Sequence, residues 1–558
     1  MSGKTTFKDA ADNVRQVFDG LHALFPGRTQ RLAALSLTAA LFSGRGNVLL
    51  MGEHGAGKTK MFETLAEWIT IPKAKFSGVY NSVTEVYGWM SELASTVDPR
   101  KPGGQPYDDP AGALMSNLIY GVRNTYTELG DKLKVTTEVD LHLFPQAAKL
   151  LGGKEPVREP ARFYFRQVTK SERAENVLAP ALTYKPLLGA RPPHVDPNCA
   201  AHADVVLFDE ALANPMFMAD AHKFLFNRVA DTQLGELFAR PLLVGVAANP
   251  ATEDYATNPD LLNYATLDRF SFSAFLQAPT SFEAGRGYAA MERLKKSPKK
   301  PEIPVEVVSA VAQVVREEVS RLDLAFEKLL LQTLDSCFYN PQKGEATLLS
   351  PVSPFINQHD CSVCRFRDMA PCAVANVSPT RVTDDLPYAM VVSAMVNGHE
   401  RPEVGDTATA LLIVLPAKLK LGDAYRYNPY GAINEVIKRY ETVMSIELAN
   451  EENVFVLMRK LPPARDLTPD QAEKAIADVE TITPAFKDRP VALIMASNYK
   501  AEAMGRLPIS KSAEVATISN VLSEVSELMK KEIENLKKGV AKKQAHASEK
   551  VNQSGRSH

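Results

Sequence analysis

The stretch that decides the fold is Gly52-Glu53-His54-Gly55-Ala56-Gly57-Lys58-Thr59. Its glycines let the backbone curl so that successive N–H groups point at an anion, and a helix that starts at its end adds its positive pole. Lys58 and Thr59 stand where loops of this kind place an ammonium group for the outer phosphates and a hydroxyl for Mg²⁺. We therefore predict that this stretch is a phosphate-binding loop.

The residues on either side of the loop fit the same interpretation. Residues 47–51 form a short apolar run suited to a buried parallel strand, and residues 61–69 carry apolar side chains at helical spacing. A strand, a glycine-rich loop and a helix in this order predict an α/β fold with a parallel sheet.

Composition limits the other possibilities. The chain has 558 residues, 45% hydrophobic and 23% charged, and its 64 basic side chains are balanced by 66 acidic ones. This length predicts several domains, and the near-neutral charge provides no overall field for nucleic acid or an anionic membrane. No apolar run approaches the ~20 residues that cross a bilayer, and five cysteines do not suggest a disulfide scaffold. We expect a cytoplasmic protein without membrane insertion.

A second motif lies at the end of another apolar run. Residues 205–208 have the character of a buried strand, and Asp209 and Glu210 follow directly. One carboxylate can hold Mg²⁺ while the other polarises a water molecule that attacks a γ-phosphate. Two acids after an apolar strand are common in structural roles too. Downstream of a phosphate loop, we interpret Asp209 as a magnesium ligand with Thr59, and Glu210 as the catalytic base.

Two more positions are candidates for the same site. Residues 242–248 form a third apolar run, and Asn249 at its end can reach a γ-phosphate or the attacking water. Taken alone, the Asn-Pro pair is simply a turn. Arg269 stands beside an apolar run, where it is either a surface ion-pair residue or a group that completes a neighbouring subunit's active site.

Together these motifs resemble the MoxR-like branch of the AAA+ ATPases, which includes RavA-type and magnesium-chelatase-type motors. The resemblance is carried by residues 46–59, 208–215, 227–231, 248–250 and 267–270, in the family's order and approximate spacing. It implies an AAA+ P-loop NTPase core in a homo-oligomeric, hexameric ring that binds ATP and Mg²⁺ between subunits. It also implies that Asn249 is the first sensor and that Arg269 is an arginine finger acting in trans.

The resemblance continues into an α-helical lid. Ser378-Pro-Thr-Arg381 stands where this family carries a second sensor arginine, which implies that Arg381 contacts the γ-phosphate of its own subunit. Without the family, Arg381 is merely an arginine in the first turn of a helix. We place the core at residues 1–285 and the lid at residues 300–424.

One long segment departs from the family. Between Trp89 and Asp204 the chain is longer than a minimal motor needs, which predicts an insert at about residues 95–200 that elaborates the surface or faces the pore. Residues 162–166 (Arg-Phe-Tyr-Phe-Arg) are interpreted as one arm of the hairpin that this branch inserts near its second helix.

Four of the five cysteines gather within the predicted lid, in a Cys-rich insert at residues 337–376. The pair Cys361 and Cys364 can place two sulfurs on one ion. The other candidate ligands are Cys337, Cys372 and His359. Structural zinc is our first hypothesis; an iron–sulfur cluster and buried cysteines without a metal are the alternatives.

Beyond the lid the family offers no guide. We expect a helical or mixed module at residues 425–512, in which Thr468 caps a helix and Gln471 reaches back to it. Residues 513–540 carry one apolar stripe of a long helix, which docks on the protein itself or pairs with a partner. Residues 541–558 are predicted to be a disordered basic tail.

The resemblance implies an ATP phosphohydrolase that performs chaperone-like remodelling or activation of a partner protein or complex, often one with a von Willebrand factor A domain. The sequence has no Asp-x-Ser-x-Ser metal motif, so a separate chain would supply that domain. The alternative is a nucleic-acid motor resembling the McrB-type GTPases, in which the Cys-rich insert or the basic tail binds DNA or RNA. A nucleotide switch without motor activity is a third hypothesis.

Overall fold

The computed structural model describes residues 5–101, 104–182, 194–249, 264–296, 301–322, 338–340, 345–347, 375–377, 379–421, 430–438, 467–482, 499–500 and 503–507. These residues form two compact units. The first contains the described residues up to Glu317 together with Tyr388–Ala417, and the second contains the others. The phosphate loop and the acidic pair both belong to the first unit.

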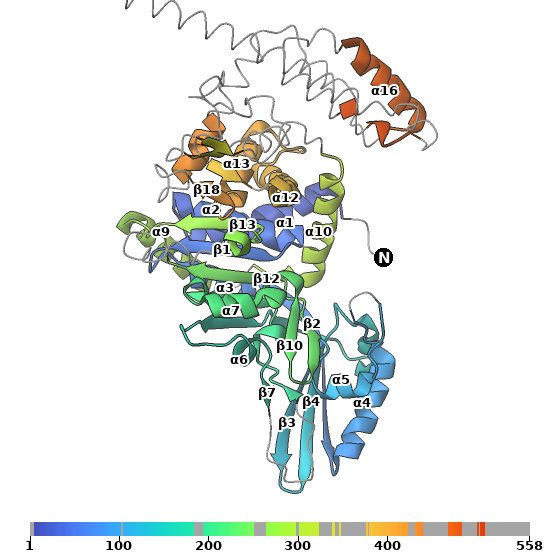
Figure 1. The fold of residues 1–558 in the computed structure, drawn as a ribbon. Helices are drawn as coiled ribbons and strands as arrows, with labels where there is room; N and C mark the ends of the chain where they lie inside the picture. Colours follow the sequence, from blue (N-terminus) through green and yellow to red (C-terminus); the bar gives the residue numbers. More distant parts are fainter. Residues whose placement is uncertain are drawn as a thin grey trace, which may run out of the picture. The chain divides into compact units, whose positions relative to one another are not determined.

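Five parallel strands form the central sheet of the first unit (Figure 1). Their order across the sheet is β13 (Phe272–Leu276), β1 (Asn47–Gly52), β12 (Leu243–Ala248), β9 (Val205–Asp209) and β6 (Phe163–Gln167). Both β1 and β12 are buried along their whole length, as their apolar runs predict. The predicted α/β fold with a parallel sheet is confirmed.

Helices pack closely on this sheet. α2 (Arg28–Ser43) contacts β13 and β1, while α3 (Lys58–Trp68), the helix predicted after the phosphate loop, contacts β9 and β6. A Cβ atom added to Gly245 in β12 would lie only 2.1 Å from Cζ of Phe62 in α3. Because glycine has no side chain at this position in β12, the Phe62 ring can pack directly against the sheet.

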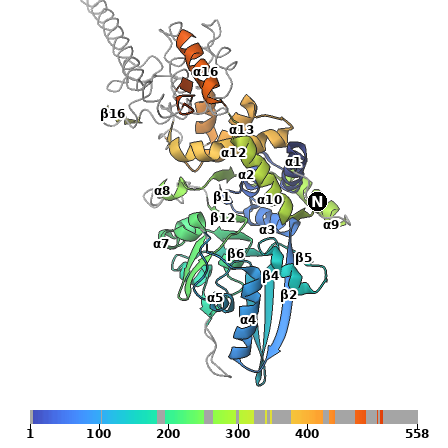
Figure 2. The same cartoon turned by 90° about the vertical axis from the view of Figure 1, so that its right-hand side faces the viewer.

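Four of the five strands of a second sheet are inserted between α3 and β6. The order across this sheet is β14 (Ile303–Pro304), β2 (Ile69–Tyr80), β4 (Lys132–Asp140) and β3 (Val122–Leu129), with β5 (Val157–Pro160) paired to β2. β14 is the exception, because it follows the last strand of the central sheet in the chain. Figure 2 shows α4 (Val83–Val97) beside β2 and β4, and α4 also contacts α5 (Pro110–Met115). Residues 69–160 are called the insert below. This sheet leaves the central fold at Ile69, earlier than the start near residue 95 that we expected.

The prediction that residues 162–166 form one arm of an inserted hairpin is wrong. Residues 163–167 form β6, which pairs in parallel with β9 at the edge of the central sheet. The insert has already ended at this point, so this aromatic run is the chain's return to the sheet. Tyr164 packs edge-on against Phe208 of β9, with ring centroids 6.4 Å apart.

The remaining helices and strands complete the first unit. They are α1 (Phe7–Leu24), η1 (Pro145–Leu151), α6 (Glu175–Leu178), β7 (Ala181–Leu182), β8 (His194–Val195), η2 (Ala200–His202), η3 (Ala211–Ala213), α7 (Pro215–Asp220), η4 (Lys223–Asn227), β10 (Val229–Thr232), β11 (Gly235–Phe238), α8 (Tyr264–Leu267), α9 (Ser281–Lys296), α10 (Val305–Val319) and α13 (Val404–Val414). α13 contacts α2 and β13. In the part of the chain that the structure describes, no helix is long and apolar enough to cross a membrane.

The second unit contains short antiparallel strand pairs and helices. β15 (Phe338–Asn340) pairs with β16 (Glu345–Thr347), and β17 (Ala375–Val377) pairs with β18 (Leu419–Leu421). α12 (Pro379–Asn397) starts in this unit.

The start of α16 (Pro469–Ile482) confirms another prediction. The Gln471 N–H donates to Oγ1 of Thr468 over 3.4 Å, and the Thr468 N–H donates to Oε1 of Gln471 over 2.9 Å. This is the expected reciprocal cap. The predicted helix at residues 513–540 and the predicted tail at residues 541–558 lie outside the described residues.

We expect Gly245→Ala to lower the free energy of unfolding by about 1–3 kcal/mol, because the added methyl group must displace the Phe62 ring. Gly88→Ala is the matched control: Gly88 lies inside α4, and nothing lies within 4 Å of its added Cβ. Alanine should stabilise that helix by about 1 kcal/mol. Denaturant unfolding of both variants measures the difference, and shifts in the same direction would contradict the packing argument.

Candidate active site

Glycine conformations shape the loop between β1 and α3. Gly55 and Gly57 have φ angles of 78° and 91°, in the left-handed region that residues with a Cβ seldom adopt. A Cβ atom on Gly52 would lie 2.4 Å from the carbonyl oxygen of Leu276 in β13. By contrast, nothing lies within 4 Å of the Cβ position of Gly55. The loop is thus packed tightly at its base and open at its middle, as a cradle for a ligand requires.

Lys58 lies across this loop from the first turn of α3. Its buried Nζ donates hydrogen bonds to the carbonyl oxygens of Gly52, over 2.5 Å, and Glu53, over 3.1 Å. Burial lowers the pKa of the Lys58 ammonium group, and the negative charges of Asp209 and Glu210 oppose that shift. The lysine and the acidic pair, distant in sequence, therefore belong to one electrostatic site.

The acidic pair ends β9 as predicted. Asp209 lies opposite Ala247 of β12, and Ala248 lies opposite Met51 of β1, so one strand separates the acids from the phosphate loop. Asn249 follows that intervening strand directly. Parallel strands end at the same edge of the sheet, so the loop, Asn249 and the acids come together there.

Glu210 leaves the strand through a strained backbone conformation. Its φ and ψ angles are 58° and 15°, which is uncommon for a residue other than glycine. Its N–H donates to the carbonyl oxygen of Ala247 over 2.8 Å and to Oδ1 of Asp209 over 3.1 Å. Strain of this kind costs about 1–3 kcal/mol and tends to occur at functional sites.

Gln167 is a site residue that the sequence analysis missed. It ends β6 opposite Asp209, and its Nε2 donates a hydrogen bond to Oε2 of Glu210 over 3.1 Å. The signal was present, since a polar side chain ends an apolar strand here as at Asn249. It was overlooked because residues 162–166 were interpreted as part of an insert.

Thr59 and Asp209 fit a magnesium ion. Thr59 lies in the first turn of α3, beside Lys58. Burial raises the pKa of the Asp209 carboxyl, and the charge of Lys58 lowers it. A hydroxyl and a carboxylate are oxygen ligands of the kind that Mg²⁺ prefers.

The two predicted arginines belong to different units of the chain. Arg269 precedes β13; its guanidinium contacts Nε2 of His222 and lies 5.9 Å from the ring centroid of Phe226. Arg381 lies in the first turn of α12, as expected for a residue at a helix start.

The predicted metal site of the lid is a separate matter. Cys337, Cys361, Cys364, Cys372 and His359 all lie outside the described residues. Among the residues that are described, no group of three or more histidine, cysteine, aspartate or glutamate side chains is arranged to hold a metal ion. The zinc or iron–sulfur hypothesis gains no support from them.

Comparisons with known proteins add little to this geometry. No family model and no curated protein matches the sequence. A crystal structure of a candidate ATPase from Cytophaga hutchinsonii ATCC 33406 is similar with a TM-score of 0.44 and 13% identity, over 77% of this chain and 94% of that chain. A full-length MCM homolog from Methanopyrus kandleri has a TM-score of 0.31 and 10% identity, over 78% of this chain and 61% of its own. Both scores are low, so the strand order and the loop geometry define the class: an α/β protein with a parallel sheet and a glycine-rich loop between β1 and α3.

We expect Lys58→Ala to abolish tight nucleotide binding, because it removes the buried ammonium group that the loop holds toward the phosphates. Isothermal titration with ATP and Mg²⁺ measures the loss. Lys60→Ala is the control, since Lys60 in the same helix is exposed and pairs with Glu63. Equal affinities for the two variants would refute the role of Lys58.

A pH effect on stability follows from Asp209. Its pKa is higher in the folded protein than in the unfolded chain, so its ionised form costs stability at neutral pH, and this cost disappears as the pH falls through the folded pKa. Without nucleotide, Asp209→Asn should therefore melt at a higher temperature than the wild type at pH 7, with a smaller difference at pH 4. A variant that is less stable at pH 7 would show that the Asp209 side chain stabilises the folded protein.

Proposed function

We propose that this chain is an AAA+ ATPase of the MoxR-like branch, which forms a ring and uses ATP hydrolysis to remodel or activate a partner protein or complex. One observation carries the proposal. The phosphate loop, Asn249, the acidic pair and Gln167 stand at the carboxyl ends of four adjacent parallel strands. A phosphoryl-transfer site needs this combination of a phosphate cradle, metal ligands and a residue that activates water.

The division of roles follows from the geometry. The backbone N–H groups of the loop and the Lys58 ammonium group would bind the phosphates, while Thr59 and Asp209 would hold Mg²⁺. The bound magnesium ion supplies positive charge that neutralises the phosphate oxygens. Glu210 accepts the proton of the attacking water, and Gln167 fixes one oxygen of that carboxylate by its hydrogen bond.

The amide of Asn249 completes the polar edge of the sheet. It follows the strand that lies between the loop and the acidic pair. A side chain at that point is suited to contact both the γ-phosphate and the attacking water, which supports the role of first sensor.

The arginines extend the proposal to the ring. Arg269 contacts His222 and Phe226 and precedes the amino end of β13, whereas the phosphate loop follows the carboxyl end of the parallel strand β1. This placement supports a role in trans on the neighbouring subunit. We assign Arg381 the role of second sensor for its own subunit. The partner would be a protein or complex, and a von Willebrand factor A protein is our first candidate.

Glu210→Gln should keep ATP binding but reduce turnover by about 10²–10⁴-fold, because the amide cannot accept the proton of the attacking water. ATPase rates and particle mass, with and without ATP and Mg²⁺, are measured for the variant and the wild type together. Asp220→Asn, an exposed carboxylate change on α7, is the control. If Glu210→Gln hydrolyses at the wild-type rate, Glu210 is not the base. Turnover and assembly that require DNA or RNA would instead favour the nucleic-acid motor.

A mixing experiment tests the shared site. Arg269→Ala should bind ATP normally yet hydrolyse it about 10³-fold more slowly, since an arginine finger contributes at least that factor. Lys58→Ala subunits bind no ATP but still carry Arg269. Mixing the two inactive variants should restore part of the activity, because each supplies what the other lacks. No recovery in mixed rings, verified by mass, would place Arg269 outside the neighbour's site.

A further inference from the structure

The amino ends of β6 and β9 are joined as closely as their carboxyl ends. Oδ2 of Asp204 accepts a hydrogen bond from the Arg162 N–H over 2.8 Å, and the Arg162 carbonyl accepts from the N–H groups of Asp204 and Val205, each over 3.0 Å. At the opposite ends, Gln167 donates to Glu210. The two strands are therefore clamped at both ends, about 16 Å apart at the usual rise per residue.

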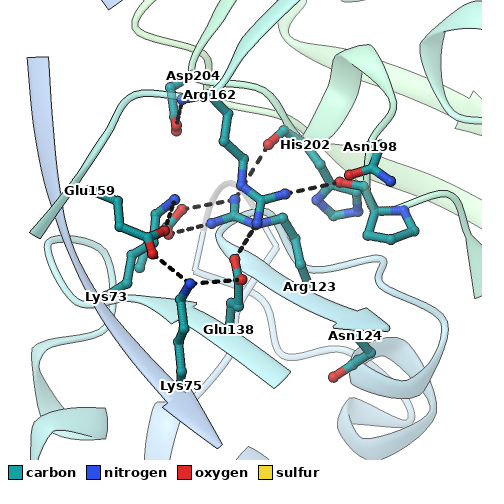
Figure 3. Close-up of polar contacts among 12 residues, drawn as sticks. Lys73, Lys75, Arg123, Asn124, Glu138, Glu159, Arg162, Asn198, His202 and Asp204 are labelled. Carbon is teal, nitrogen blue, oxygen red and sulfur yellow. Dashed lines mark hydrogen bonds and ion pairs between the residues drawn. The ribbon is translucent and has the colours of Figure 1, made fainter. Parts of the chain in front are cut away.

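The clamp at the amino ends is also bound to the insert. The hydroxyl of Tyr120, just before β3, donates to Oδ1 of Asp204 over 3.0 Å. The guanidinium of Arg162 forms an ion pair with Glu138 of β4. Arg123 of β3 donates from Nη1 to the carbonyl oxygen of His202 over 3.3 Å, two residues before Asp204. Figure 3 shows Arg123 and Arg162 side by side, between the insert and the start of β9.

The centre of this cluster is buried, and its acidic and basic side chains are equal in number. Arg123 and Asp140 are 1% and 0% exposed and form a two-pronged ion pair. Lys75 and Glu159 lie nearer the surface, with 39% and 32% of their side chains exposed. The ionisable members of the cluster are Lys73, Lys75, Arg123, Arg162, Glu138, Asp140, Glu159 and Asp204. Removing one partner from such a pair costs about 3–5 kcal/mol. Because separating the paired charges is costly, we expect the insert and the amino ends of β6 and β9 to move together. We call this cluster the joint.

These charges are not needed merely to attach the insert to the central sheet. One contiguous apolar core already joins the insert to the central sheet; it includes Val86 and Leu93 of α4 as well as Phe208 and Val246 of the sheet. Apolar side chains hold two elements together at least as well as buried ion pairs do. What hydrogen bonds add is direction, since they fix which atoms face each other.

The hydrogen bonds of Tyr120 and Asp204 match this role. Burial raises the pKa of the Tyr120 hydroxyl well above its usual value, so it remains a donor. Burial and the charge of Asp140 raise the pKa of Asp204, while the charge of Arg123 lowers it. Both oxygens of Asp204 accept hydrogen bonds, as a carboxylate does.

We propose that Asp204 is a positioning residue that couples the insert to Glu210: a force on the insert passes through Tyr120 and Arg162 to the starts of β6 and β9, and along both strands to the contact between Gln167 and Glu210. This inference rests on the proposed ATPase function. The insert is then a part of the molecule through which a bound partner sets the rate of hydrolysis.

The test breaks the link from the insert that ends directly on Asp204. Tyr120→Phe removes the hydroxyl that reaches Asp204 and leaves the bonds between Asp204 and Arg162 in place. Tyr126→Phe is the matched control, because the hydroxyl of Tyr126 donates to the Met115 carbonyl over 2.6 Å, entirely within the insert. Each variant of the full chain loses one hydrogen bond of a tyrosine hydroxyl, which is buried for Tyr120 and partly buried for Tyr126, so both should lose similar stability.

Two measurements follow. In Tyr120→Phe, kcat at saturating ATP should fall about fivefold, the rate equivalent of one hydrogen bond, with the affinity for ATP unchanged. Hydrogen exchange at the Val168 and Glu210 amides, which bond to Asp209 and Ala247, should become about tenfold faster. Tyr126→Phe should change neither. Equal effects of the two variants would overturn the proposal.

A double variant tests the route. With Gln167→Ala in the background, Tyr120→Phe should cause no further loss of kcat, because the contact at the end of the route is already gone. A full fivefold loss in that background would overturn the route through Gln167. If the wild type does not hydrolyse ATP, the proposed function fails and the effect on rate fails with it. Hydrogen exchange does not depend on activity, so it still shows whether the loss of the Tyr120 hydroxyl affects the backbone at Glu210.

Discussion

Parallel strand pairing is the constraint on which the rest of the structure depends. Five strands run in one direction, so whatever follows each strand emerges at the same edge of the sheet. Residues far apart in sequence, from Gly52 to Glu210, are therefore brought into one site by the sheet itself. The order of the strands matters equally, because β12 between β1 and β9 sets Asn249 between the loop and the acids.

Much of this arrangement could be predicted from the sequence, because its signals are local. The glycines around Lys58 demand left-handed backbone angles, and the apolar runs before Asn249 and Asp209 suit buried strands. The prediction failed where the evidence was not local. Whether residues 163–167 pair with β9 or with a neighbouring hairpin depends on contacts between residues that are far apart in the chain, and composition does not encode those contacts. Gln167 was missed for the same reason.

The buried charges were also beyond a sequence-based prediction. Arg123, Asp140 and Asp204 look like ordinary surface residues until β3, β4 and β9 are placed, and then they are almost completely enclosed. Only the pairing register of β3 and β4, with Arg123 opposite Glu138, explains how so many charges can be buried together. Their cost is offset because each charge meets an opposite one, and not because any single contact is strong.

Lys58 has a consequence for how the site meets its ligand. An ammonium group has three N–H donors, and the two hydrogen bonds to Gly52 and Glu53 use two of them. In the proposed function, the third donor is the one that a phosphate oxygen would accept. The two bonds also brace the loop between β1 and α3 internally. For the proposed nucleotide, a loop that is already braced would lose little conformational freedom on binding.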